Sequence, residues 1–254
     1  MPAFSLDLLL VPQGPEAAVI RRGLGRADSL GAVVIPIPLG TSSLAQALLL
    51  GPGRELFFQG PRNVLVMGLC GSLVPELQTG DLVVIRECCH ADHPLTSVAL
   101  PCDPALTAEI ATRLAPCQPV RALSSARVIA SAAEKHLCRA TSQAEIVEME
   151  GYGVLQLLSP LGHRVAMVRV VADENRNDIP DLTPAITATG SLSPLLLAGL
   201  LLRHPVAALR LIRCSLHGLA VLHRISSLLA CGFVDTACID SAPSVGSAVD
   251  KGGI

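Results

Sequence analysis

The sequence predicts a single α/β domain built on a mostly parallel central sheet flanked by helices. Three observations predict it. Short apolar runs alternate with segments of helical spacing, half of the 254 residues are hydrophobic, and the run at residues 165–171 is apolar except for Arg169. Strands that alternate with helices favour parallel pairing. A run buried on both faces is typical of a central parallel strand.

Each element follows from the local pattern. The apolar runs predict strands at residues 8–11, 32–36, 63–67, 81–85, 120–123, 146–149 and 165–171. The helical spacing predicts helices at residues 16–24, 44–50, 103–114, 132–140 and 151–158. Asp103 is the expected N-cap of the third helix, since its carboxylate can accept a first-turn N–H. A C-terminal helical extension from about residue 191 completes a domain at residues 1–235, and residues 236–254 are expected to be a disordered tail.

Composition narrows the function classes. The net charge of −2 disfavours nucleic acid as a partner, because phosphate backbones are bound through strong basic patches. Nine cysteines without a Cys-x-x-Cys pair predict free thiols and a cytoplasmic protein. No signal peptide is expected, and the apolar run at 195–202 is shorter than the roughly 20 residues that span a bilayer. Cys88-Cys89-His90 with His93 fits no common zinc spacing, so no metal site is expected.

A glycine-containing segment follows the strand predicted at 63–67. Gly68-Leu69-Cys70-Gly71-Ser72-Leu73 is expected to form a turn whose bare backbone N–H groups hold an anion or a ribose oxygen. A turn without a ligand is the alternative. Cys70 is interpreted as a small apolar residue and not as a nucleophile, since no histidine partner is indicated.

Two acidic segments stand at the ends of predicted strands. Glu148, Met149 and Glu150 end a short strand, and an ionised carboxylate there suits the paired hydroxyls of a ribose. The alternative is that these acids favour the dipole of the following helix. Asp173 ends the most apolar strand, where desolvation should raise its pKa and make it a general acid. A role as the N-cap of the next turn or helix is the alternative.

Three segments in order resemble the purine nucleoside phosphorylase and nucleosidase superfamily. They are the glycine segment at 68–73, Val147–Gly151 and Arg169–Asp173. Within that superfamily the chain looks most like the hopanoid-associated phosphorylases, to which residues 132–135 and 201–205 are similar. The resemblance covers roughly residues 7–225. It implies a nucleoside phosphorylase-like fold that cleaves the bond between a purine base and a ribose.

The resemblance implies two catalytic residues. Asp173 would be the general acid that protonates the purine at N7. Glu16 would activate water in a hydrolytic enzyme. Phosphate is the other nucleophile to consider, and a phosphate ion usually needs a cation. Where many true phosphorylases have an arginine just before the glycine turn, this chain has Met67. The residues that could replace that arginine are Arg21, Arg22, Arg62 and the hydroxyl residues Thr41 to Ser43. The nucleophile stays open, no cofactor is expected, and inorganic phosphate is a possible co-substrate.

Seven further positions are implied to bind substrate. Glu150, with its neighbours, would hold the ribose hydroxyls and support the oxocarbenium-like sugar of the transition state. Where the family has an aromatic residue against the base, this chain has Val128. Where the family has a serine before the catalytic acid, this chain has Ala172, which removes a hydroxyl that orients the carboxylate. The implied substrate-binding residues are Glu148, Met149, Glu150, Cys70, Gly71, Val128 and Ile129.

The C-terminal region carries no acidic residue between Leu182 and Val234. Its basic residues share one helical face, beside a face of leucines. A basic amphipathic helix can lie on an anionic membrane, so a peripheral membrane contact or a lipid-linked substrate is one interpretation. Packing on the sheet is the simpler one, and an interface of a homo-oligomer, which we expect, would also use the leucines. The basic residues on that face are Arg210, Arg213, His217 and Arg224.

The expected small-molecule partner is a purine nucleoside whose 5′ substituent the sequence leaves open. Adenosine, methylthioadenosine, homocysteinyl-adenosine, futalosine and an adenosyl-lipid all fit. The alternative function is a catalytically degenerate protein that binds nucleosides or assembles without turnover. Ala172 supports that alternative, as does Ser72, which stands where the family has the second glycine of the turn. The intact pair of Glu150 and Asp173 argues against it.

Overall fold

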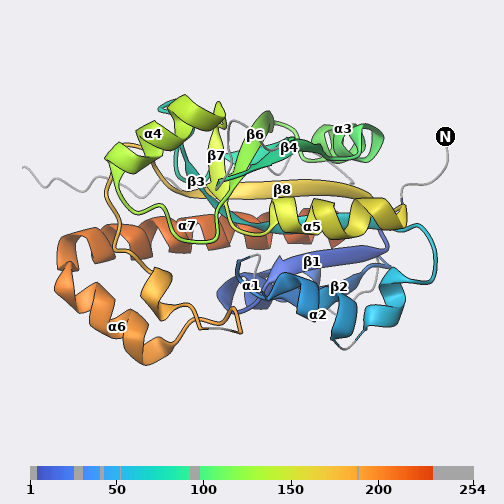
Figure 1. Ribbon diagram of the computed structural model, residues 1–254, viewed down its shortest axis with the longest axis horizontal. Helices are drawn as coiled ribbons and strands as arrows, with labels where there is room; N and C mark the ends of the chain where they lie inside the picture. Colours follow the sequence, from blue (N-terminus) through green and yellow to red (C-terminus); the bar gives the residue numbers. More distant parts are fainter. Residues whose placement is uncertain are drawn as a thin grey trace, which may run out of the picture.

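The computed structural model describes residues 5–25, 31–40, 43–51, 53–91, 98–187 and 189–230 (Figure 1). Its strands are β1 (Leu8–Pro12), β2 (Val33–Ile37), β3 (Asn63–Ser72), β4 (Leu82–His90), β5 (Leu100–Pro101), β6 (Gln118–Ser124), β7 (Ile146–Glu148) and β8 (Arg164–Asp173). Its helices are α1 (Pro15–Leu24), α2 (Leu44–Leu50), α3 (Pro104–Arg113), α4 (Ala132–Ser142), α5 (Gly151–Leu158), α6 (Pro194–Arg203) and α7 (Pro205–Ala230). The tail predicted at 236–254 lies outside the described residues.

The strands form one sheet in which five members close into a ring. β3 pairs with β8, β8 with β4, β4 with β6, β6 with β7, and β7 returns to β3. β1 and β2 extend the sheet outward from β3, and β5 pairs with β4. Five of these eight pairings are parallel, which confirms the predicted α/β class with a mostly parallel sheet. The closure of the ring was not predicted.

β3 changes its neighbour halfway along its length. On one side it pairs with β8 throughout, while on the other side it pairs with β1 at Val64–Val66 and with β7 at Gly71 and Ser72. Between those two pairings, residues 67–70 have no strand neighbour on that side among the described residues. Ligands bind in α/β sheets where neighbouring strands diverge in this way. The fold therefore opens a site beside the middle of β3.

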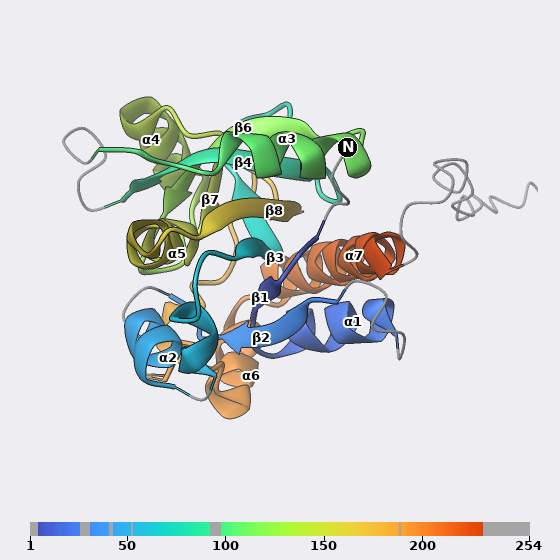
Figure 2. The same cartoon turned by 90° about the vertical axis from the view of Figure 1, so that its right-hand side faces the viewer.

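Helices cover both faces of the sheet, as the alternating pattern predicted (Figures 1 and 2). Ile20 of α1, Leu106 of α3 and Leu222 of α7 lie in one core cluster. Leu44 of α2 and Val154 of α5 lie in a second cluster on the opposite face. The predicted N-cap of α3 is confirmed, because the Asp103 carboxylate accepts a hydrogen bond from the Leu106 N–H.

The predicted turn at Gly68 is wrong, because β3 continues through Ser72. The chain turns later, where the Ser72 hydroxyl donates to the carbonyl of Val74 and accepts from its N–H. β4 is likewise longer than predicted and includes Cys88 and Cys89, whose side chains enter core clusters on opposite sides of the strand. The two-residue strand β5 had no signal in the sequence.

The C-terminal extension consists of two helices that differ in their surroundings. The inner face of α7 packs against α1, β8 and β3, so α7 belongs to the domain. By length and composition α7 is apolar enough to cross a membrane, and only 17% of its most apolar window is buried. Large apolar side chains are exposed along both helices: Leu195, Leu196, Leu202, Val206, Leu209, Ile212 and Leu216.

Candidate active site

A cavity of about 210 Å³ lies where β1, β7 and β8 end around β3. The nine residues singled out in the sequence all line it, although they come from five different parts of the chain. Aliphatic side chains from β1, α7 and the loops complete its wall. The nine are Glu16, Cys70, Gly71, Val128, Ile129, Glu148, Met149, Glu150 and Asp173.

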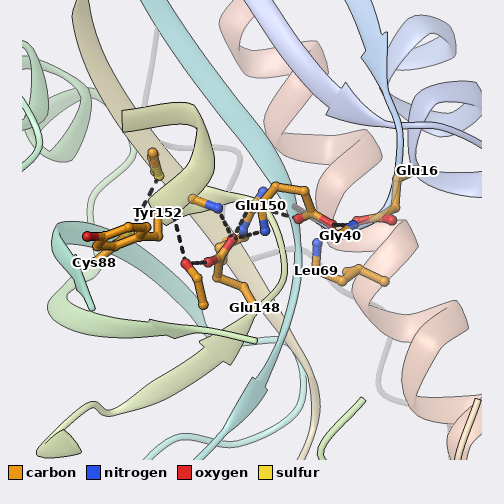
Figure 3. Close-up of polar contacts among 11 residues, drawn as sticks. Glu16, Gly40, Leu69, Cys88, Glu148, Glu150 and Tyr152 are labelled. Carbon is orange, nitrogen blue, oxygen red and sulfur yellow. Dashed lines mark hydrogen bonds and ion pairs between the residues drawn. The ribbon is translucent and has the colours of Figure 1, made fainter. Parts of the chain in front are cut away.

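Glu16 enters the cavity from the first turn of α1. Its Oε1 accepts a hydrogen bond of 2.6 Å from the backbone N–H of Leu69, in the part of β3 that lacks a strand neighbour on this side (Figure 3). Burial raises the pKa of Glu16 to about 7, which this N–H bond and the charge of Arg169 oppose. A carboxyl group with that pKa can act as a base near neutral pH.

Gly68 lets two buried polar groups approach β3. A Cβ atom there would lie 2.7 Å from Nη1 of Arg169 and 2.9 Å from Oε1 of Glu16. Any side chain at position 68 would therefore displace one of these groups. The glycine serves close approach here and not the turn that the sequence suggested.

Glu148 is the most heavily bonded acid of the site. Its carboxylate accepts from the N–H groups of Glu150 (3.0 Å) and Gly151 (2.7 Å), from the Ser124 hydroxyl, and from Nη2 of Arg169 (2.7 Å; Figure 3). These partners leave it little capacity for a ligand. Its bonds to the start of α5 match the helix-terminus interpretation of this acid. Glu148 thus holds α5 and Arg169 in place at the edge of the cavity.

Glu150 has far fewer partners. One oxygen lies 3.3 Å from the N–H of Gly40, and the other lies 3.3 Å from Nη2 of Arg169 (Figure 3). Burial raises the pKa of this carboxyl group, and the Arg169 guanidinium opposes the rise. Both contacts are long, so the carboxylate keeps lone pairs for hydroxyl donors in the cavity.

Asp173 stands at the end of β8, as predicted. Both of its oxygens contact Nζ of Lys135, at 2.8 and 2.7 Å, and Lys135 is completely buried. Burial raises the pKa of Asp173 to about 6, in the predicted direction, while the Lys135 ammonium opposes the rise. Because Ala172 precedes it, Asp173 lacks the orienting hydroxyl of the family pattern. The structure supplies an orienting ammonium instead.

Gly71 and Cys70 form the wall of β3 next to Asp173. A Cβ at Gly71 would lie 3.0 Å from Oδ2 of Asp173 and 3.2 Å from Val147, so a side chain there would require these neighbours to shift. The thiol of Cys70 is buried, which raises its pKa far above the usual value. It stays protonated at physiological pH, which agrees with the interpretation of Cys70 as a small apolar residue.

The segment after β6 provides the remaining wall. Val128 donates its N–H to the Thr183 hydroxyl at 3.1 Å, and Ile129 is buried beside it. No aromatic side chain belongs to the described lining, whose apolar members are aliphatic residues, proline, Met149 and Cys70. A flat ligand in this cavity would therefore pack against aliphatic side chains.

The cations that the sequence offered for phosphate do not line the cavity. Arg62 precedes β3 and so lies at the opposite end of that strand, and it pairs weakly with Asp7 at 4.0 Å. Arg21 and Arg22 are exposed in the last turn of α1. Thr41 and Ser42 lie outside the described residues, and Ser43, at the N-cap position of α2, is not part of the lining. Among the described residues no group of His, Cys, Asp or Glu is arranged to hold a metal ion.

Sequence reasoning missed two residues that organise the site. Arg169 was noted as the break in an apolar strand and as the start of one family-like segment, with no role assigned, yet it is fully buried and pairs with Glu148 and Glu150. A charge inside a buried strand must have partners, so two nearby acids were the available signal. Lys135 was noted only for its resemblance to one subgroup. It is one of two lysines in the chain, the other being Lys251.

The fold and cavity define a nucleoside phosphorylase-like α/β protein with a carboxylate-rich pocket. A family profile described as Phosphorylase superfamily matches residues 12–189, and the chain belongs to that superfamily. A comparison with curated proteins found no match. Solved structures of other proteins support the fold independently.

Two kinds of nucleosidase share this fold. The 5′-methylthioadenosine/S-adenosylhomocysteine nucleosidase of Helicobacter pylori aligns with a TM-score of 0.62 and 16% identity, over 90% of this chain and 97% of its own. Futalosine hydrolase of the same organism aligns with a TM-score of 0.59 and 18% identity, over 87% and 97%. The 5′-methylthioadenosine/S-adenosylhomocysteine nucleosidase of Colwellia psychrerythraea, solved in complex with adenine, aligns with a TM-score of 0.57 and 18% identity, over 87% of this chain and 98% of its own.

Proposed function

We propose that this protein hydrolyses the N-glycosidic bond of a purine nucleoside. The observation that carries the proposal is the convergence of three differently held carboxyl groups on one cavity. Asp173 is held by an ammonium, Glu150 has lone pairs to spare, and Glu16 has a pKa of about 7. An acid, a sugar ligand and a base are the three groups that such a reaction needs.

Asp173 is the general acid of the proposed reaction. As the C1′–N9 bond breaks, its electron pair moves into the purine, and the Asp173 proton is transferred to N7. The base then leaves as a neutral molecule. A pKa of about 6 keeps part of the Asp173 population protonated near neutral pH, which an unperturbed aspartate would not do.

Glu150 is the proposed ligand of the ribose hydroxyls. Its carboxylate would accept two hydroxyl hydrogen bonds, which strengthen as positive charge develops on the sugar. Met149 supplies an apolar contact from the same segment. Glu148, whose partners are all within the protein, acts on substrate only by fixing this segment.

Water is the nucleophile that the surroundings of Glu16 favour. Nη1 of Arg169 is buried without a partner in the described part of the chain, and it converges with Glu16 beside Gly68. A water molecule there would find one donor and one acceptor, and Glu16 would take its proton as the oxygen attacks C1′. Phosphate would need an unpaired cation, whereas Arg169 already balances two carboxylates and Arg127 pairs with Glu134.

The deciding experiment incubates the pure protein with a purine nucleoside panel, with and without inorganic phosphate. Free base and free ribose at equal rates in both conditions support hydrolysis. Ribose 1-phosphate, formed only with phosphate, would contradict hydrolysis while keeping the rest of the mechanism. Nucleoside binding without release of base from any member of the panel would favour the degenerate alternative.

We also propose that the exposed apolar face of α6 and α7 contacts an anionic lipid surface. The face is acid-free and flanked by Arg203 and Arg213, and Leu209 and Leu216 are each 61% exposed on it. The opposite face of α7 lines the cavity through Leu211 and Ser215. This position and the resemblance to hopanoid-associated phosphorylases favour an adenosyl-lipid as substrate, acted on by a cytoplasmic protein at the membrane.

A further inference from the structure

Lys135 is the only lysine among the described residues, and its side chain is completely buried. Burying an ammonium is costly unless its hydrogen-bonding capacity is satisfied. Here Nζ contacts the Asp173 carboxylate and also donates to the backbone carbonyls of Glu174 (2.8 Å) and Asn177 (3.2 Å). The ammonium is thus committed to Asp173 and to the loop after it.

The helix that carries Lys135 is tied firmly to the same loop. The Ser131 hydroxyl caps α4 by accepting the N–H of Glu134. The first N–H of α4, from Ala132, donates to Asp178 at 2.8 Å, and the N–H of Ile179 donates to the carbonyl of Ala130 at 2.9 Å. Lys135 therefore projects from a fixed base, and its position relative to β8 is defined.

Few other charged or titratable groups face the Asp173 carboxylate. Glu174, next to it in the chain, bonds to the N–H and hydroxyl of Thr79, and the buried Cys70 thiol faces it from β3. Arg210 of α7 borders the neighbouring hollow and donates to the Asn177 side chain at 2.6 Å. Lys135 is the cation whose nitrogen lies within bonding distance of both Asp173 oxygens.

We propose that Lys135 is a positioning residue for the reaction: it aims the Asp173 carboxyl group into the cavity and stabilises the carboxylate that remains after proton transfer. The inference rests on the proposed function and deepens it. When the O–H bond of Asp173 breaks and the N7–H bond of the purine forms, negative charge develops on Asp173, 2.7 Å from a fixed ammonium. The attraction is strong because the pair is shielded from water.

The same contact sets the pH range of the acid. An opposite charge at this distance lowers the pKa of a carboxyl group by about 1–3 units. Lys135 accordingly opposes the rise in the pKa of Asp173 that burial causes. Without Lys135, Asp173 would keep its proton to higher pH. It would also be a weaker proton donor, because its conjugate base would be unpaired in an apolar site.

The test compares pH profiles of Lys135→Met, Lys135→Arg and wild type on the best nucleoside of the panel. In Lys135→Met we expect kcat to fall about 10–100-fold, the high-pH limb of kcat/KM to move up by about 1–3 pH units, and KM to change little. Lys135→Arg, which keeps the charge, should restore the limb and part of kcat. Arg139→Met is the matched control. It removes a partly exposed cation from the same helix as Lys135, where Arg139 pairs with Glu145 of the following segment.

Two measurements separate this role from loss of structure and from failure of the proposed function. The Asp173 carboxyl can be titrated directly by carbon NMR in wild type and Lys135→Met, which requires no turnover. If Lys135→Met does not fold, Lys135→Met/Asp173→Asn removes both charges and should restore folding. The inference is overturned if wild type is active but Lys135→Met shows no shift in either the high-pH limb of kcat/KM or the Asp173 titration. An inactive wild type would overturn the proposed function instead.

Discussion

The backbone N–H of Leu69 donates to the Glu16 carboxylate over 2.6 Å, across the gap where β3 has no strand neighbour on that side among the described residues. One short bond does not offset the burial of Glu16, so its pKa stands at about 7 against 4.5 unperturbed. The folded state therefore holds a proton that the unfolded state releases as pH rises from about 4.5 to 7. Stability from this group is complete below pH 4.5 and is lost as pH rises through 7.

Glu16→Gln should remove that pH dependence. The amide oxygen can still accept the Leu69 N–H, while no charge is buried at high pH. We expect the variant to exceed wild type in unfolding free energy by about 3 kcal/mol at pH 8, and to match it near pH 4. Urea unfolding at the two pH values measures the difference. Hydrolysis should be lost in Glu16→Gln. If the variant and wild type have the same unfolding free energy at both pH values, burial of an ionisable Glu16 is contradicted.

Asp173→Asn should lower kcat by roughly two to four orders of magnitude, the usual contribution of general acid catalysis. The variant keeps the size of the side chain, so near-native circular dichroism is expected. Steady-state kinetics at pH 6 measures the effect. A rate within about threefold of wild type would exclude Asp173 as the acid.

Glu150→Gln should weaken discrimination between ribose and 2′-deoxyribose substrates. The change retains the shape of the side chain but exchanges charge-assisted hydrogen bonds, worth about 1.5–3 kcal/mol each, for neutral ones. The ratio of kcat/KM for a nucleoside and its 2′-deoxy analogue reports this loss. An unchanged ratio with reduced stability would make Glu150 a structural partner of Arg169 only.

Gly71→Ala should damage the reaction with little effect on folding. The added methyl group would meet Asp173 at 3.0 Å and Val147 at 3.2 Å, and so turn the acid away from its position. We expect kcat/KM to fall at least about 10-fold. Gly199→Ala is the matched control, because nothing lies within 4 Å of a Cβ at that position in α6. Equal activity of the two variants would show that the wall beside Asp173 is not tight.

The apolar face of α6 and α7 should bind anionic vesicles at low ionic strength. Each basic residue near such a surface contributes about 1 kcal/mol, which salt screens, so binding should weaken sharply towards physiological salt. Co-sedimentation with vesicles of anionic and neutral lipids measures it, and Leu209→Glu with Leu216→Glu should abolish it. If wild type binds neither anionic nor neutral vesicles, and these substitutions convert a dimer into a monomer, the face is a subunit interface.

The sequence pointed to the residues that line the cavity, but not to the backbone geometry that brings them together. Charged residues at strand ends are visible as breaks in apolar runs, which is why Glu150 and Asp173 were found. Gly68 suggested a turn because a glycine in a strand and a glycine in a turn look alike in one sequence. Its actual reason, the approach of Arg169 and Glu16, depends on contacts between distant segments. The same holds for Lys135, whose role depends on a residue 38 positions away.

The five-stranded ring has a consequence for how the molecule opens. Each ring strand is paired on both sides over part or all of its length, so the doubly paired segments of β3, β7 and β8 cannot fray from an edge. Their amide hydrogens should exchange with solvent only when the whole domain unfolds. β2 is the outermost strand beyond the ring and, among the described strands, pairs only with β1, so its amides should exchange sooner. Asp173 ends a ring strand and Glu150 closely follows one, whereas Glu16 reaches the cavity from α1, outside the ring, so the acid and the sugar ligand are held by the part of the molecule that opens last.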